Sequence, residues 1–457
     1  DINASDSYKV NCIQNIDGDI WIGAGNNLLS RLDERTDAMD NYSGSAFNFG
    51  AVHCLLKYTD KELLVGTDNG LYLFDQNTNT FQRADNPADP RSLSDQTING
   101  MMWDAEGALW VLTNLGGINY MSKQTKRFDY YSPAYLSGVP GAGEVVAPFC
   151  ENKDGNIWIG TQSGLYFFNA ATRELSPYAI GGTKNQKYDI RSLMLDGDGR
   201  IRVINLRTGA VKAYTHSRGI PNTICSNDVL CIYKGRKGEI YVGTSWGLCC
   251  YDPVRDNFMT ITSIGSMVSV VDIYEDMYNH LWIATSNSGV FSYNTMNAHW
   301  KHYQHEREDS TTITSNSVIT LFEDAKGTMW FGTNGGGLCS FDAKEKRFIE
   351  FDPHNTLLPN KVIYAIEQDQ GGDFWVSSNA GIFKINPVTK DHFRQFTIND
   401  GLQGNQFIAR SSLKSSEGKL YFGGINGFNV FQPEQFVDNK YIPPVYVTDI
   451  RLPYQTD

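Results

Sequence analysis

The stretch Asp154-Gly155-Asn156-Ile157-Trp158-Ile159-Gly160-Thr161, followed by Gly164-Leu165, predicts a tight turn that leads into a β-strand. Asp, Gly and Asn tolerate the positive φ angles of a hairpin turn. The next residues are β-branched or aromatic, which favours a strand, and Gly164 allows the chain to reverse again. A single hairpin occurs in many folds, so the recurrence of this pattern decides the fold.

The pattern recurs along the whole chain at intervals of 39 to 48 residues. There are ten copies, and six of the nine tryptophans occupy the position of Trp158. The residues at this position are Trp21, Leu64, Trp110, Trp158, Arg202, Tyr241, Trp282, Trp330, Trp375 and Tyr421. A fixed period of this length indicates repeated structural units, and we expect the six tryptophans to lie in the core between them.

Each repeat contains four short segments of alternating apolar residues. Around Trp330 these segments are Val318–Glu323, Thr328–Thr333, Leu338–Asp342 and Arg347–Phe351. Four antiparallel strands in roughly 45 residues are typical of a β-propeller blade, and the 3.6-residue periodicity of helical repeats is absent. The sequence therefore predicts an all-β protein built from four-stranded propeller blades.

The last repeat contains only three clear strands, at Phe407–Leu413, Lys419–Gly423 and Phe428–Gln432. Because an open sheet edge needs a partner, we expect the strand-like segment Lys126–Tyr131 to pair with it and close the ring. This predicts three blades of an N-terminal propeller at residues 1–125 and a seven-bladed propeller at residues 126–437. A single larger ring is the alternative.

Composition limits the function. The net charge of -12 and the pI near 5.2 argue against a nucleic-acid surface or binding to an anionic membrane. No run of 18 apolar residues is present, so we expect any membrane contact to lie in segments absent from this sequence. The chain does not begin with Met, which suggests a processed or excised piece.

The eight cysteines have no paired CxxC spacing, and four of them recur at equivalent strand positions, Cys12, Cys54, Cys150 and Cys231. We expect free, buried core cysteines and no zinc site. His299, His302 and His305 are spaced by three residues, which puts successive side chains on opposite faces of a strand. The sequence therefore predicts neither a metal nor a cofactor.

Three groups of residues carry a family resemblance. The repeat Glu323-Asp324-Ala325-Lys326-Gly327-Thr328-Met329-Trp330-Phe331-Gly332-Thr333 resembles the regulator propeller repeat of hybrid two-component systems. The segments Gly401–Phe407, Tyr421–Phe428 and Phe431-Gln432-Pro433 are similar to the last blade before that family's Tyr-rich immunoglobulin-like domain. Pro443-Pro444-Val445-Tyr446-Val447-Thr448-Asp449 resembles the first strand of that domain, so residues 438–457 are expected to begin it.

The chain thus resembles the periplasmic sensor region by which glycan-degrading Gram-negative bacteria detect polysaccharide fragments. In such proteins two seven-bladed propellers precede the immunoglobulin-like domain, a membrane helix, a histidine kinase and a DNA-binding response regulator. The resemblance implies an oligosaccharide ligand, regulation of glycan-use genes, and a homodimer in the full-length protein. It implies no catalysis by this fragment, whereas the full-length protein would be a histidine kinase. Ten repeats instead of fourteen, and Arg202 at an anchor position, depart from the family pattern.

Candidate ligand residues follow from the two faces of a propeller. The loops that connect consecutive blades are long, polar and varied, which favours binding on their face. Trp246 lies in a turn on that face and could stack on a sugar ring, unless it covers a neighbouring blade. Arg207 and Arg218 lie in nearby loops and could bind a carboxylate or sulfate, although solvated arginines are the simpler interpretation.

Three further polar residues lie on the same face. Asn334 could place an amide at the channel mouth, although Asn is also a common turn former. Asn405 and Gln406 are candidates, but the resemblance suggests that they help to define the last blade. The alternatives to a sensor are a propeller glycoside hydrolase or lyase, which needs two carboxylates about 5 to 10 Å apart, and a protein-interaction propeller, which would show a large apolar patch.

Overall fold

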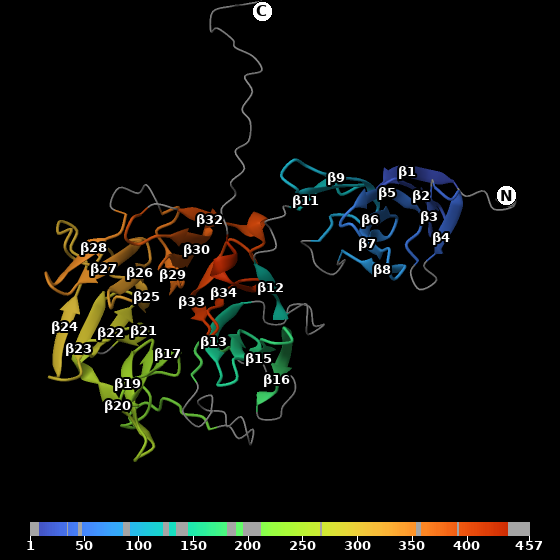
Figure 1. Ribbon diagram of the computed structural model, residues 1–457. Helices are drawn as coiled ribbons and strands as arrows, with labels where there is room; N and C mark the ends of the chain where they lie inside the picture. Colours follow the sequence, from blue (N-terminus) through green and yellow to red (C-terminus); the bar gives the residue numbers. More distant parts are fainter. Residues whose placement is uncertain are drawn as a thin grey trace, which may run out of the picture. The chain divides into compact units, whose positions relative to one another are not determined.

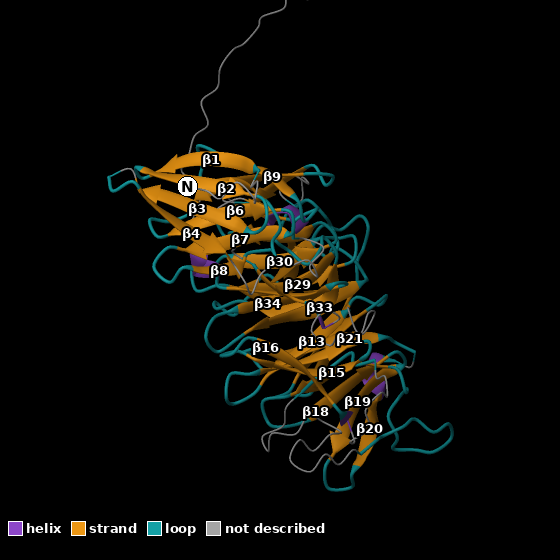
Figure 2. Ribbon diagram, turned by 90° about the vertical axis from the view of Figure 1, so that its right-hand side faces the viewer, coloured by secondary structure: helices purple, strands orange, loops and turns teal. Residues whose placement is uncertain are grey.

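The computed structural model describes residues 9–33, 35–43, 48–85, 92–121, 128–133, 145–180, 189–194, 212–265, 267–352, 358–390 and 393–436. These residues form antiparallel sheets arranged as blades (Figure 1), and Figure 2 shows strands and loops with only short helical turns. They divide into two compact units, one within residues 1–125 and one within residues 126–436. The predicted all-β propeller architecture is confirmed.

The first unit contains three sheets. Their strands are β1 (Val10–Ile16), β2 (Asp19–Ala24), β3 (Leu28–Asp33) and β4 (Ala38–Ser43); β5 (Val52–Lys57), β6 (Glu62–Thr67), β7 (Gly70–Asp75) and β8 (Thr80–Arg83); and β9 (Ile98–Trp103), β10 (Leu109–Thr113) and β11 (Ile118–Met121). Within each sheet, each strand pairs with the next one along the chain.

The second unit contains six four-stranded sheets within the described ranges. Their strands are β13 (Val146–Glu151), β14 (Ile157–Thr161), β15 (Gly164–Asn169) and β16 (Glu174–Tyr178); β17 (Val229–Lys234), β18 (Ile240–Thr244), β19 (Gly247–Asp252) and β20 (Asn257–Ile261); β21 (Val270–Glu275), β22 (His280–Thr285), β23 (Val290–Asn294) and β24 (His299–Tyr303); β25 (Val318–Glu323), β26 (Met329–Thr333), β27 (Leu338–Asp342) and β28 (Arg347–Glu350); β29 (Ile363–Gln368), β30 (Phe374–Ser378), β31 (Gly381–Ile385) and β32 (Arg394–Phe396); and β33 (Phe407–Lys414), β34 (Leu420–Gly424) and β35 (Gly427–Phe431) with β12 (Asp129–Tyr131). Short helical turns are η3 (Thr262–Ile264), η4 (Ile398–Asp400) and η5 (Pro433–Gln435).

Within each blade, successive strands lie farther from the centre of the ring, as Figure 1 shows for β25 to β28. In this blade, β25 and β27 have the predicted bounds, and β26 and β28 differ from them by one residue. The local pattern of the sequence is sufficient here because hairpin turns and alternating apolar residues act over a few residues.

The outermost strand of the last blade comes from the beginning of the second unit. Strand β12 pairs antiparallel with β35, with Asp129 opposite Val430 and Tyr131 opposite Phe428. The Tyr131 ring stacks on Phe428 at a centroid distance of 5.2 Å. The predicted pairing is confirmed for the described residues of this segment, and it joins the two ends of the unit. Most of the fifth repeat, including Arg202, lies outside the described residues.

Glycine in the second strand of the blades allows the next blade to approach closely. A Cβ atom on Gly332 would lie 2.7 Å from the side chain of Ile363 in the next blade. The corresponding distance from Gly160 to Ile190 is also 2.7 Å. Because both distances are far shorter than a van der Waals contact, the Gly of the Trp-x-Gly pattern is required by packing between blades.

Most anchor tryptophans are braced by an aspartate six residues earlier. In the eighth repeat, Asp324 Oδ1 accepts the backbone N–H groups of Lys326 and Thr328, both at 2.9 Å, and Oδ2 accepts the indole N–H of Trp330 at 3.0 Å. One carboxylate therefore fixes both the turn and the ring. The same hydrogen bond, from the indole N–H to an aspartate Oδ2, joins Trp110 to Asp104, Trp282 to Asp276 and Trp375 to Asp369.

The fourth repeat lacks this brace. Asn152 replaces the aspartate, and its Oδ1 accepts the N–H groups of Asp154 and Asn156, both at 2.9 Å. Its amide nitrogen is a donor, so it cannot accept the indole N–H of Trp158. The Trp158 Nε1 atom is buried and has no hydrogen-bond partner among the described residues.

The expected burial of the anchor tryptophans is confirmed for five of them and wrong for Trp110. Trp21, Trp158, Trp282, Trp330 and Trp375 are at most 7% exposed, whereas Trp110 is 38% exposed. Trp110 lies on the open face of the sheet β9–β11, and the apolar side chains Met102, Leu112, Ile118 and Tyr120 are also exposed. The opposite face, with Leu109 and Val111, is buried against the second blade. A core position is buried only where another blade covers it.

The cysteines differ from the prediction at one pair. Cys225, in the loop before β17, forms a disulfide with Cys249 of strand β19. The prediction of free cysteines is therefore wrong for these two, because the fold brings together residues that are 24 positions apart. The cysteines at positions 12, 54, 231, 250 and 339 are free.

Candidate functional site

Trp246 lies in the two-residue turn between strands β18 and β19, which is enclosed by the paired residues Thr244 and Gly247. The Thr244 hydroxyl donates to the carbonyl of Gly247 at 2.9 Å and accepts the backbone N–H of Trp246 at 3.2 Å. These bonds hold the turn, and the indole is 58% exposed. The turn therefore presents an aromatic surface to solvent from a fixed backbone.

The loop beside Trp246 is anchored at several points. His216 Nδ1 lies 2.8 Å from the carbonyl of Ile224, and the His216 backbone N–H donates to Asn227 Oδ1 at 2.6 Å. The next residue after Ile224, Cys225, forms the disulfide with Cys249. The imidazole of His216 lies edge-on to Trp246, with ring centroids 6.4 Å apart. The structure thus pairs Trp246 with a histidine that the sequence analysis did not select.

Among the described residues, no contact joins Arg218 to Trp246. Arg218 is exposed, and the described part of the chain contains no ion pair that involves it. Arg207 lies outside the described residues. An anion site formed by these arginines beside the indole therefore stays a prediction.

Asn334, Asn405 and Gln406 are all exposed. Asn334 continues the strand pairing, with an isolated bridge to Val362. Asn405 Oδ1 accepts the backbone N–H of Ile398 at 2.9 Å, and the Gln406 carbonyl accepts from Gln403 Nε2 at 2.8 Å. These contacts agree with the structural interpretation, while the amide of Gln406 remains available to a ligand on geometric grounds.

Gln403 explains the sequence motif of the last blade. It is 2% exposed, its Oε1 accepts the N–H of Asn426, and its backbone N–H donates to Asn429 Oδ1. Asn429 in turn donates to the carbonyl of Asp129 in β12. A buried amide network therefore fixes the closing strand, and the motif Gly401–Phe407 has a structural role there.

The innermost strands carry a second group of polar side chains. Arg410 has a φ of 57° in the irregular part of β33, and its guanidinium donates to the carbonyl of Leu230 in β17 at 2.8 Å. Burial raises the pKa of Asp272 to about 6, although Arg410 and the N–H groups of Leu321 and Ile273 oppose this shift. Arg410 thus links two blades that are distant in the sequence.

Glu367 is a further carboxyl group on an inner strand. Its Oε1 accepts the hydroxyl of Ser412 at 2.8 Å. Burial raises the pKa of Glu367 to about 7, against the opposing effect of that hydrogen bond and of Lys414. Within the described ranges no cleft pairs Glu367 with a second carboxylate, and its hydrogen bond to Ser412 gives it a structural role.

A cleft of about 410 Å³ opens between the seventh and eighth blades, on the side of the turns opposite Trp246. Its base is aromatic and apolar, with Trp282, Tyr303, Met329 and Phe341. Its walls are polar, with Asp276, Tyr278, His280, Ser292, Asn294, Asn297, His299, Lys301 and Lys346. An aromatic base with polar walls is typical of a small-molecule site, and the sequence analysis did not select these residues.

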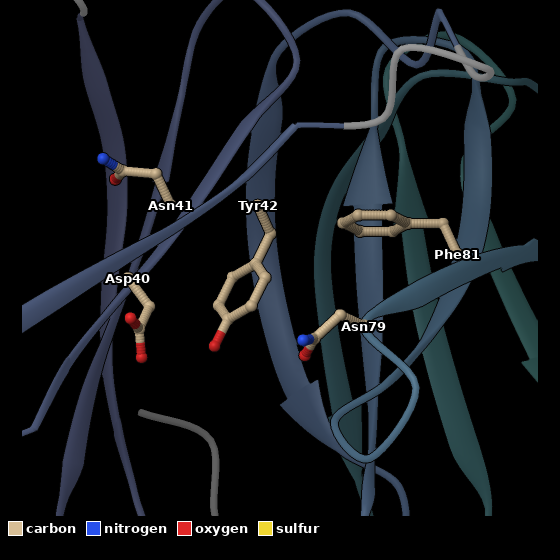
Figure 3. A pocket seen from close by; sticks show the side chains of 5 residues that line it. All are labelled: Asp40, Asn41, Tyr42, Asn79 and Phe81. Atoms are coloured by element: carbon tan, nitrogen blue, oxygen red, sulfur yellow. The ribbon is translucent and has the colours of Figure 1, made fainter.

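The first unit has a cleft of about 480 Å³ at a related place between two blades, surrounded by Asp40, Asn41, Tyr42, Asn79 and Phe81 (Figure 3). Tyr42 stacks on Trp21 with ring centroids 5.9 Å apart, the same distance as between Tyr303 and Trp282. Here the lining contains a carboxylate and two amides but no lysine.

The described residues contain no cluster of His, Cys, Asp or Glu that could hold a metal ion, and no helix among them is long and apolar enough to cross a membrane. His302 stacks on Phe291 at 3.9 Å, and His305 Nδ1 lies 2.8 Å from the carbonyl of Ile313. These two histidines are therefore engaged in packing and in holding a loop.

Comparison with known proteins supports the predicted resemblance. The family model described as "Two component regulator propeller" matches residues 263–287 and 312–335, which belong to the seventh and eighth repeats. Histidine kinase P4 of Formosa agariphila is 25% identical over 363 residues, which cover 75% of this chain and 25% of that protein. The chain therefore carries regulator-type propeller repeats, and it spans about a quarter of this curated relative.

Two solved structures have the same fold. They are extracellular domains of hybrid two component systems from B. thetaiotaomicron, with TM-scores of 0.52 and 0.54 and identities of 23% and 20%. The alignments cover 98% and 97% of this chain and 60% of each solved chain. At these identities the likeness establishes the fold.

Proposed function

We propose that this chain, which carries regulator-type propeller repeats, is the extracytoplasmic sensor part of a hybrid two-component histidine kinase. The repeats match the regulator propeller model, and the relatives with this fold are a histidine kinase and extracellular domains of two-component systems. In a Gram-negative bacterium, a sensor of this kind would lie in the periplasm. Kinase activity and dimer formation belong to the full-length protein.

The ligand proposed is an oligosaccharide, and the response is the regulation of glycan-use genes. The observation that carries the ligand class is Trp246, because a 58% exposed indole on a braced turn can stack on the apolar face of a sugar ring. His216 beside it and the exposed Arg218 in the same loop supply polar groups for hydroxyl or acidic substituents. Binding would favour one arrangement of the sensor over another and so change kinase activity.

Calorimetric titration of this chain against defined neutral and acidic oligosaccharides, with product analysis of the same samples, tests the proposal. We expect one member to bind without turnover and Trp246→Ala to weaken binding by at least about tenfold, since buried aromatic contacts often dominate binding. Met296→Ala is the matched control, because Met296 is a 70% exposed side chain on the opposite turns. Equal weakening by both variants would contradict a role for Trp246.

Two other functions make different predictions in this experiment. Turnover of an oligosaccharide would support a glycoside hydrolase or lyase and overturn the sensor proposal for this chain. Absence of binding across the panel, combined with capture of a protein partner, would favour an interaction propeller.

A further inference from the structure

The cleft between the seventh and eighth blades lies beside a small residue that faces the anchor Trp282. In each blade, the anchor residue of the second strand has a partner directly opposite on the third strand. In three other blades that partner covers the indole: Arg31 lies over Trp21 at 5.8 Å, Lys384 lies over Trp375 at 5.5 Å, and Phe167 packs on Trp158 at 4.9 Å. In the eighth blade the partner of Trp330 is the small residue Ser340. Opposite Trp282 the partner is Ser292.

A serine is too short to cover the indole, so Ser292 does not cover Trp282 as the larger partners do in three other blades. Tyr303 of strand β24 stacks on Trp282 at 5.9 Å, and Phe341 of the next blade approaches it at 5.1 Å. The result is a recess with an aromatic base and a volume of about 410 Å³. This lies within the range of roughly 300 to 1,000 Å³ that is common for small-molecule sites.

The described lining of the recess contains two lysines and one carboxylate. Lys301, Lys346, His280 and His299 line it, and the described residues provide neither lysine with an ion-pair partner. The one lining carboxylate, Asp276, already accepts the indole N–H of Trp282 at 2.8 Å and the backbone N–H groups of Tyr278 and His280. An anionic group in the recess would therefore meet two available ammonium groups.

The remaining lining groups suit hydroxyl groups. Asn294 contacts His280, with 3.2 Å between Nδ2 and Nε2, and its Oδ1 accepts the backbone N–H groups of Met296 and Asn297. Asn297 and the hydroxyl of Ser292 also line the recess. Amides and hydroxyls above aromatic rings are the groups that bind a sugar, since they pair with its hydroxyls while the rings contact its apolar face.

We infer that this recess binds a saccharide that carries a carboxylate or sulfate group, with Lys301 and Lys346 pairing with the anion and Tyr303 and Phe341 contacting the sugar ring. The inference rests on the proposed function for the ligand being a saccharide and adds its charge and its place. The site lies on the turns opposite Trp246, so each location can be tested without the other.

The test is calorimetric titration of the whole chain with digalacturonate, a sulfated disaccharide and neutral galactobiose. We expect one or both acidic sugars to bind and galactobiose to bind at least about tenfold more weakly. Lys301→Gln combined with Lys346→Gln should remove that preference. Lys344→Gln is the matched control, because Lys344 is an exposed lysine of the same turn that does not line the recess.

A second variant tests the shape. Ser292→Phe places opposite Trp282 the residue that Phe167 supplies in the fourth repeat, so it should fold and fill the recess. We expect it to weaken binding of the acidic sugar by at least about tenfold with the lysines intact. Circular dichroism and thermal unfolding verify that the variant is folded.

The outcomes separate this inference from the proposed function. Loss of acidic-sugar binding in Ser292→Phe, with binding retained in Trp246→Ala, supports the recess. Loss in Trp246→Ala with no effect of Ser292→Phe overturns the inference and leaves the sensor proposal standing. Equal affinity for the neutral and acidic sugars, or no binding of either acidic sugar at millimolar concentration, also overturns it.

Discussion

Replacing Asn152 with aspartate should stabilise the second unit, because it would supply the acceptor that Trp158 lacks. Asn152 and Asp324 occupy the same position of their repeats, and each accepts two backbone N–H groups at 2.9 Å through Oδ1. Only Asp324 has a second oxygen, which accepts the indole of Trp330 at 3.0 Å. Asparagine could turn its amide to accept the indole, but it would then lose both backbone bonds.

The expected magnitude follows from the buried Nε1 of Trp158. An unpaired buried polar group costs about 1 to 3 kcal/mol, and a hydrogen bond to a charged acceptor gains about the same amount. The carboxylate of Asn152→Asp would stand near Asp154, whose side chain now lies 3.5 Å from the Asn152 amide, and this repulsion reduces the gain. We expect a net increase of about 1 kcal/mol in the free energy of unfolding.

The assay is urea unfolding monitored by circular dichroism, with thermal unfolding as a second measurement. In a unit of this size, 1 kcal/mol corresponds to an increase of about 2 °C in Tm. The matched variant Asp324→Asn recreates the fourth-repeat arrangement in the eighth repeat and should cost about 1 to 3 kcal/mol. Trp158 and Trp330 are 6% and 7% exposed, so burial does not distinguish the two sites. A loss in Asp324→Asn without a gain in Asn152→Asp would refute our account of Trp158.

Three further predictions concern stability. Glu367→Gln should stabilise the protein above pH 7 and have no effect at pH 4. Folding raises the pKa of the Glu367 carboxyl group from 4.5 to about 7, so ionisation of this group destabilises the folded state as the pH rises through this window. Because Glu367 is partly exposed, we expect about 1 to 2 kcal/mol, measured by urea unfolding at both pH values, and a pH-independent effect would contradict the mechanism. Replacing Cys225 and Cys249 with alanine should lower the free energy of unfolding by about 3 kcal/mol, as expected for a disulfide that closes a loop of this length. An unchanged free energy of unfolding would exclude a stabilising disulfide. Leu112→Gln should change stability by no more than about 0.5 kcal/mol and reduce binding of a hydrophobic dye, because Leu112 is 47% exposed; a large loss of stability would show that this face is covered.

Much of the fold could be predicted because its determinants are local. The turn before Trp330 and the alternation of β25 and β27 act over a few residues, so strand bounds were predicted to within one residue. Pairing of β12 with β35 could also be predicted, because the last repeat lacks a strand and an unpaired edge is unfavourable.

The candidate sites were less predictable, since they depend on neighbours that are distant in the sequence. The sequence indicated an aromatic turn residue at Trp246 but not the histidine beside it, because His216 precedes it by 30 positions and reaches it through an anchored loop. Each partner of the indole brace, by contrast, stands six residues before its tryptophan, as Asp324 does for Trp330, so a regular spacing in the sequence could have revealed it.

The sequence by itself determined the repeat and the four strands of each blade, because hydrogen bonds and side-chain alternation within a hairpin are local. It also determined the way the last blade is completed, because the last repeat lacks a strand and its open edge needs a partner. Only the tertiary structure decided which repeated positions are covered. Trp110 and Trp282 occupy the same position, yet the first is exposed because no blade among the described residues of its unit covers its face, and the second lines a recess beside the small Ser292. Burial depends on what lies opposite in the next strand and the next blade, and no single repeat contains that information.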